Sequence, residues 1–382
     1  MGSKIKNGLY LLFLGLLILP LVQEHLHLKE VAPLDGAYNL APPTQFSVHT
    51  WFEGSYQQEK NKYCNDWLGF RPYMVRLNNQ LDFTLFRKTH ADGIILGTDN
   101  YLYQFYYTDD YSGKNKLDTT LAHERLWHLK ALQDTLEKLG KTVLLVHAPS
   151  KASLYPEHFP QGMPFVPSNA NHTLYRHIAD SLGIHQLDIN DWFVAIKNST
   201  KEMLMSRQGV HWTVFGSVLA ADSLIKYFER VRHISMPALK WNKAEHSTDA
   251  RLTDNDISKT LNLIFPVRKE VFCYPEVYYA GDSTKTKPNA IYIGDSFVWT
   301  LISDSLMKNV NRNWEFWYYF HEMHNQHIMD DHIPATPMDG YDWLSALQNT
   351  DCLVFVYTSH NLPQLGNGFL EKAYNHYFPA KK

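Results

Sequence analysis

The residues best suited to chemistry lie in two short motifs, the first of which centres on a serine. Residues 293–297 read Ile-Gly-Asp-Ser-Phe, so that an apolar run ends, a glycine turns the chain and Ser296 precedes an expected helix. In an open α/β sheet, ligands bind beyond the carboxyl ends of the strands, where this hydroxyl would be exposed. Nearby backbone N–H groups would stabilise a developing oxyanion. Such triplets also cap ordinary helices, so the motif alone leaves both roles open.

The second motif supplies a base. Residues 209–213 read Gly-Val-His-Trp-Thr and lead into a helical pattern over residues 214–228. A nucleophilic serine needs a proton acceptor within hydrogen-bond reach, and imidazole serves near neutral pH. We therefore expect His211 to act on Ser296. His360 is the second choice among the 20 histidines, because it follows the last predicted strand.

Alternating strand and helix patterns must position these motifs. The apolar runs that predict strands cover residues 142–146, 184–189, 290–293, 314–320 and 353–356. Strands separated by helices favour a mostly parallel sheet with helices on both faces. Residues 232–288 look irregular and are expected to form an insertion.

The composition narrows the class of protein. With 45% hydrophobic and 20% charged residues the chain is not intrinsically disordered, and a formal net charge of −3 indicates no nucleic-acid partner. Cys64, Cys273 and Cys352 show neither a disulfide framework nor zinc-type spacing. The histidine-rich residues 321–332 match no strong metal motif, so we expect no metal and no cofactor.

The N-terminus predicts a membrane anchor. Residues 7–23 are uncharged and follow two lysines, and their apolar part, residues 8–22, would span about 22 Å as a helix, short of a hydrocarbon core of about 30 Å. No small-residue cleavage site follows, which favours a retained anchor over a cleaved signal. The lysines stay cytoplasmic, so the body faces outward. The expected organisation is an anchor at 1–30, a linker, helical region and hairpin at 31–118, and a catalytic domain at 119–382.

With their surroundings, the two motifs resemble the polysaccharide O-acetyltransferases of the alginate-acetylation type, the AlgJ/AlgX-like proteins, over most of residues 50–362. Other segments that carry the resemblance are Asn65-Asp66 with Phe70-Arg71, and residues 93–103, 143–155 and 254–263. The resemblance implies an SGNH-hydrolase-like (flavodoxin-like) three-layer α/β/α fold with a permuted motif order, in which the histidine precedes the serine. It implies catalytic roles for Ser296 and His211. It also implies roles in shaping the site or contacting substrate for Gly294, Asp295, Phe297, Trp212, Lys151 and Tyr155.

One position departs from the family pattern. The family usually places an aspartate two residues before the histidine, and this chain has Gly209 there. The acid of such a set fixes the imidazole tautomer and stabilises the imidazolium. Three readings are open: another carboxylate, such as Asp188 or Asp191, approaches His211 from the preceding segment; a backbone carbonyl orients the ring; or the protein has lost catalysis and only binds.

The function implied by the resemblance is O-acetylation of an extracytoplasmic polysaccharide through an acetyl-serine intermediate. The chain would be held at the inner membrane by residues 7–23 and face the periplasm. A membrane-bound O-acyltransferase would be the partner that supplies the acetyl group. The alternatives are an esterase with the same serine and histidine, and a non-catalytic glycan-binding subunit.

Overall fold

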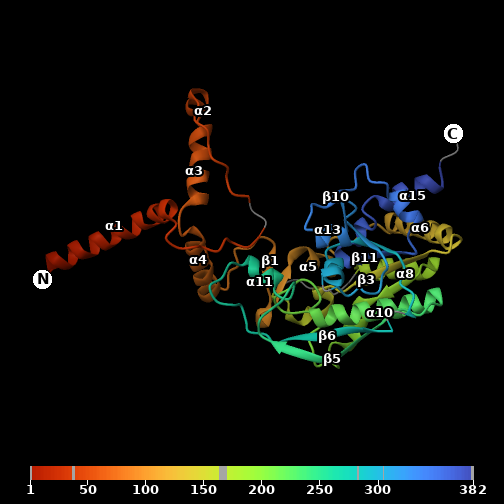
Figure 1. Ribbon diagram of the computed structural model, residues 1–382. Helices are drawn as coiled ribbons and strands as arrows, with labels where there is room; N and C mark the ends of the chain where they lie inside the picture. The colour runs from red at the N-terminus through yellow and green to blue at the C-terminus, as the bar shows by residue number, and fades with distance from the viewer. Residues whose placement is uncertain (1, 37–38, 163–169, 282–283, 304, 380–382) are drawn as a thin grey trace. The chain divides into compact units, whose positions relative to one another are not determined.

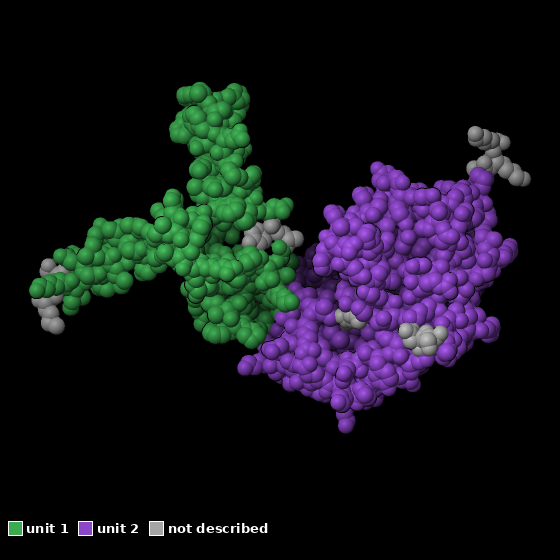
Figure 2. Space-filling view, viewed as in Figure 1, with its two compact units in different colours: residues 1–92, 258–267 green, residues 93–257, 268–382 purple. Residues whose placement is uncertain are grey.

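The computed structural model of the chain describes residues 2–36, 39–162, 170–281, 284–303 and 305–379 (Figure 1). It divides into two compact units, coloured separately in Figure 2. Unit 1 comprises Met1–Asp92 and Ser258–Val267, and unit 2 comprises Gly93–Ile257 and Arg268–Lys382. Both sequence motifs that carry chemistry lie in unit 2.

Unit 1 is helical and begins with a candidate membrane span. Its helices are α1 (Gly2–Leu26), α2 (Val48–Glu53), α3 (Ser55–Trp67) and α4 (Arg71–Phe86). Within Lys4–Leu26, the most apolar 18 residues have a mean hydropathy of 2.0, and α1 extends beyond the 15 residues that are most apolar. At 1.5 Å per residue the whole helix is about 37 Å long, enough to cross a bilayer.

Unit 2 contains a seven-stranded sheet in the order β10-β9-β8-β7-β11-β3-β4. In that order the strands are Thr336–Pro337, Glu322–Asn325, Trp314–Tyr318, Ala290–Gly294, Cys352–Thr358, Thr142–Ala148 and Gln186–Asp188. Neighbouring strands from β8 to β4 are parallel, and β9 and β10 add an antiparallel edge. The expected mostly parallel sheet is therefore confirmed.

Helices cover both faces of this sheet. In β3, Val143 and Leu145 enter one apolar cluster and Leu144 and Val146 enter the other, because successive side chains of a strand point to opposite faces. The first cluster includes residues of α6 (Thr119–Glu137), α8 (Ala170–Leu182) and α15 (Phe369–Tyr377). The second includes residues of α9 (Ile189–Ile196), α10 (Val214–Arg232) and α12 (Phe297–Ser303). The three-layer α/β/α architecture is thereby confirmed.

Two antiparallel ribbons complete unit 2. The first pairs β1 (Ile94–Leu96) with β2 (Leu102–Gln104), and the second pairs β5 (Ala238–Ser247) with β6 (Phe272–Ala280). The second ribbon lies within the stretch that looked irregular in sequence, because most of β5 is exposed and polar and gives little apolar alternation. The remaining helices are α5 (Phe105–Tyr111), α7 (Lys151–Leu154), α11 (Asp256–Thr260), α13 (Gln326–Asp330), α14 (Trp343–Gln348) and the short 3₁₀ turns Thr98–Asn100, Pro156–His158 and Ser359–Gln364.

Candidate active site

Ser296 lies at the carboxyl end of a central strand, in the turn between β7 and α12. The turn requires Gly294, because a Cβ there would lie 2.2 Å from the carbonyl oxygen of Val356 in the neighbouring strand. Asp295 is fully buried and braces the turn. Its carboxylate accepts hydrogen bonds from the Phe297 N–H at 3.1 Å, the Thr358 N–H at 2.8 Å, and the Thr358 hydroxyl and the Asn361 amide at 2.9 Å each.

His211 directs one ring nitrogen at the serine and the other at a carboxylate. Its Nε2 is 2.8 Å from the Ser296 hydroxyl oxygen, and its Nδ1 is 2.5 Å from Oδ2 of Asp256. Oδ1 of the same carboxylate accepts the Val210 N–H at 2.8 Å. A serine, a histidine and a carboxylate in this sequence of contacts form the arrangement in which the histidine removes the serine proton and the acid stabilises the imidazolium.

The carboxylate beside His211 is neither of the two expected from sequence. The structure places Asp188 at the end of β4, where it caps α9 through the Asp191 N–H and contacts Nε2 of His172 at 3.0 Å. Asp191 lies 3.8 Å from the other ring nitrogen of His172. Both side chains thus face a different histidine. The sequence alone does not single out Asp256, although it lies in the family-like segment 254–263.

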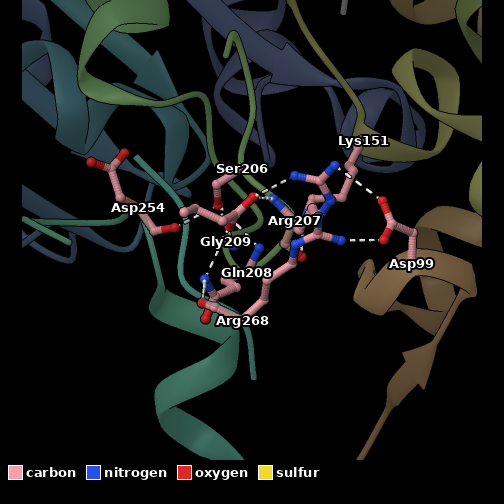
Figure 3. A network of polar contacts seen from close by, with 9 residues as sticks. Asp99, Lys151, Ser206, Arg207, Gln208, Gly209, Asp254 and Arg268 are labelled. Atoms are coloured by element: carbon pink, nitrogen blue, oxygen red, sulfur yellow. Dashed lines mark hydrogen bonds and ion pairs between the residues drawn. The ribbon is translucent and has the colours of Figure 1, made fainter. Parts of the chain in front are cut away.

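Gly209 lets the backbone just before Asp256 pack directly against residue 209. A Cβ at residue 209 would lie 2.5 Å from the Thr253 carbonyl oxygen and 3.0 Å from that of Asp254. Ser206 fixes this crossing, because its hydroxyl accepts the Gly209 N–H at 2.7 Å and donates to the Asp254 carbonyl (Figure 3). The backbone of residues 253–254 therefore occupies the space that a side chain at position 209 would need.

Asp254 lies beside this crossing and is itself buried. Its carboxylate accepts the Tyr274 hydroxyl at 2.9 Å and the Val214 N–H at 3.2 Å, at the start of α10. Burial raises the pKa of this carboxyl to about 6, and the negative charge of Asp256 acts in the same direction. Asp254 therefore anchors the segment internally, while Asp256 faces the histidine.

Lys151 and Tyr155 contact other parts of the protein close to the site. Lys151 is 3% exposed, and its ammonium donates to the carbonyl oxygens of Leu102 at 2.9 Å and Arg207 at 3.1 Å. Burial lowers the pKa of Lys151 to about 7. The Tyr155 ring packs 5.2 Å from that of Tyr101. Lys151 thus joins the first ribbon to the segment that leads to His211, and its burial leaves it out of reach of a polysaccharide.

Trp212 and Phe297 also lie beneath the site rather than on its rim. They are 1% and 0% exposed, and their rings meet edge to face at 5.2 Å. The Phe297 ring lies 4.8 Å from the imidazole of His211, and the Trp212 indole donates to the Thr300 hydroxyl. These aromatic side chains are buried: Phe297 packs against the imidazole of His211, and neither ring is exposed for contact with a sugar. His360, the second choice of base, stacks on Tyr106 at 4.6 Å.

The fold is an SGNH-hydrolase-like α/β fold. Residues 94–263 match the family described as SGNH hydrolase-like domain, acetyltransferase AlgX. The chain is also 27% identical over 195 residues to the probable alginate O-acetylase AlgJ of Pseudomonas syringae pv. tomato. That alignment covers 50% of this chain and 47% of the relative, so the chain spans about half the length of the curated relative it matches. The resemblance to the AlgJ/AlgX-like O-acetyltransferases is thereby confirmed.

Solved structures of similar proteins were also found. The O-acetyltransferase domain of Pseudomonas putida AlgJ aligns with a TM-score of 0.48 at 16% identity, covering 74% of this chain and 99% of that one. Pseudomonas aeruginosa AlgX aligns with a TM-score of 0.44 at 12% identity, covering 72% and 67% respectively.

Proposed function

We propose that this chain transfers acetyl groups to the hydroxyls of an extracytoplasmic polysaccharide through an acetyl-Ser296 intermediate. The observation that carries the proposal is the continuous set of contacts from Ser296 through His211 to Asp256. The similarity to a probable alginate O-acetylase supports acetyl as the transferred group and a polysaccharide as the acceptor. The candidate span in α1 supports attachment to the inner membrane with the body in the periplasm, where a membrane-bound O-acyltransferase would supply the acetyl group.

In the first half-reaction Ser296 takes the acetyl group. Its hydroxyl oxygen attacks the carbonyl carbon of the donor ester while Nε2 of His211 accepts the hydroxyl proton. The Asp256 carboxylate stabilises the resulting imidazolium. Among the described residues the Ser296 N–H donates to no carbonyl or side chain, so it is available to stabilise the oxyanion. The intermediate collapses when His211 returns the proton to the leaving oxygen.

The second half-reaction passes the acetyl group to the glycan. A sugar hydroxyl gives its proton to His211 and attacks the acetyl-serine. His211 then returns that proton to the Ser296 oxygen as the ester bond to Ser296 breaks. Water attacking by the same route would make the protein an esterase, because both reactions share the intermediate. The Asp256 side chain is 25% exposed, which supports access of water to this side of the site.

The test is intact-protein mass spectrometry after incubation with an activated acetyl ester. The wild-type chain should gain one acetyl group, and Ser296→Ala and His211→Ala should not. Ser303→Ala is the matched control, since it removes an exposed hydroxyl from the end of the same helix, α12. An adduct that persists in Ser296→Ala would overturn the proposal. Faster loss of the adduct with added glycan, with acetyl recovered on the sugar, would establish transfer over hydrolysis.

A further inference from the structure

A second group of reactive side chains lies at the second ribbon, outside the candidate active site. His246 of β5 and Cys273 of β6 are register partners across the ribbon. Glu202, from the segment that leads to His211, places its carboxylate oxygen 3.0 Å from Nε2 of His246. One ligand atom from each of Glu202, His246 and Cys273 lies within 4.8 Å of the other two.

We propose that Glu202, His246 and Cys273 bind a zinc ion, with water as the fourth ligand. Thiolate, imidazole and carboxylate are the ligands that zinc takes in proteins. Bond lengths of about 2.0–2.3 Å place the ligand atoms of a tetrahedral site about 3.3–3.5 Å apart. The ligand atoms therefore need to approach one another by about 1.5 Å at most. The side chains of His246 and Glu202 are 49% and 28% exposed and free to adjust around the buried Cys273.

The ligand types suit zinc. A Cys273 thiolate and the Glu202 carboxylate would together offset the two positive charges of the ion. On binding, zinc would displace the thiol proton of Cys273, forming a zinc–sulfur bond and releasing one proton to solvent. A sulfur and an imidazole ligand together exclude the oxygen-preferring ions calcium and magnesium.

The position of the group would let the ion link two segments of the chain. Glu202 precedes the turn of Ser206 and Gly209, whereas His246 leads into the segment that ends in Asp256. A zinc ion would thus join the segment that supplies the base to the segment that supplies the acid. The binding of zinc itself does not depend on the proposed acetyl transfer.

The full chain, purified in detergent without chelator, allows a direct test. We expect about one zinc per chain by elemental mass spectrometry. We also expect cobalt substitution to give the thiolate-to-cobalt absorption of a cysteine ligand. Both signals should be lost in Cys273→Ser and strongly reduced in His246→Ala. Cys64→Ser, at an exposed cysteine of unit 1, is the matched control and should keep both.

The outcomes separate this proposal from the proposed function. If Cys273→Ser fails to fold, His246→Ala decides, because its side chain is half exposed on the ribbon. Zinc bound equally well by His246→Ala and wild type, or no zinc bound at equimolar concentration, would overturn the zinc site. Neither result would alter the acetyl adduct expected on Ser296, which is measured separately.

Discussion

Asp256→Asn tests the identity of the catalytic acid most sharply. In the wild-type protein, Oδ1 of Asp256 accepts the Val210 N–H at 2.8 Å and Oδ2 faces Nδ1 of His211 at 2.5 Å. An asparagine has one acceptor oxygen, which the fixed Val210 N–H retains, so its NH₂ group must face the imidazole. The ring then carries its proton on Nε2, in the tautomer that cannot accept the proton of Ser296.

The expected loss is about 10⁴-fold in the rate of serine acylation, or about 5.5 kcal/mol in the barrier. Single-turnover acylation with an activated acetyl ester measures it, with thermal unfolding as a check on the fold. The matched control is Asp188→Asn, which keeps a side-chain oxygen to cap α9, removes only the carboxylate charge beside His172 and should leave the rate nearly unchanged. An Asp256→Asn rate within about tenfold of wild type would refute the tautomer argument.

Three further variants follow from the same contacts. Gly209→Asp restores the family's residue and should nevertheless slow acylation, because its Cβ would overlap the Thr253 carbonyl; a rate at or above wild type would contradict this. Asp254→Asn removes a carboxyl with a pKa raised from 3.8 to about 6. Because the fold favours the protonated carboxyl of Asp254, the stabilisation from this group is fully present below about pH 4 and is lost as the pH rises through about 6. Urea unfolding should therefore show the wild type losing up to about 3 kcal/mol relative to Asp254→Asn between about pH 4 and 7; parallel curves would be inconsistent with this. Lys151→Met leaves the carbonyls of Leu102 and Arg207 without their donor and should lower the free energy of unfolding by about 1–3 kcal/mol. KM for the glycan should stay unchanged, and a raised KM would indicate that Lys151 contacts the substrate.

The fold was largely predictable from local patterns in the sequence. Buried strands such as β3 and β11 are continuous apolar runs, and the helices between them carry clear periodicity. The second ribbon gave no such signal, because an exposed two-stranded ribbon has no need of an apolar face on most of its residues.

The site was predictable where one turn or one strand end sets the position of a residue. Ser296 and His211 each stand at such a turn, and the sheet brings them together. Asp256 is positioned near His211 by the pairing of β5 with β6 and by the hydrogen bond from Ser206 to the Asp254 carbonyl. These contacts join residues far apart in the chain and leave no periodic pattern in the sequence. Lys151 and Trp212 were expected to shape the site or contact substrate, whereas their depth in the fold depends on packing that sequence spacing does not reveal.

The glycine at position 209 is better explained by relocation of the acid than by loss of catalysis. A carboxylate could contact Nδ1 of His211 from position 209 or, as Asp256 does, from the segment between β5 and β6. The two arrangements need the same space. A Cβ at 209 would meet the Thr253 and Asp254 carbonyls at 2.5 and 3.0 Å, so the presence of one acid excludes the other. We therefore expect relatives with glycine two residues before the histidine to carry an aspartate at the position of Asp256. A relative with glycine there, no acid in the segment between the two ribbon strands and a normal acylation rate would show that the histidine needs no carboxylate.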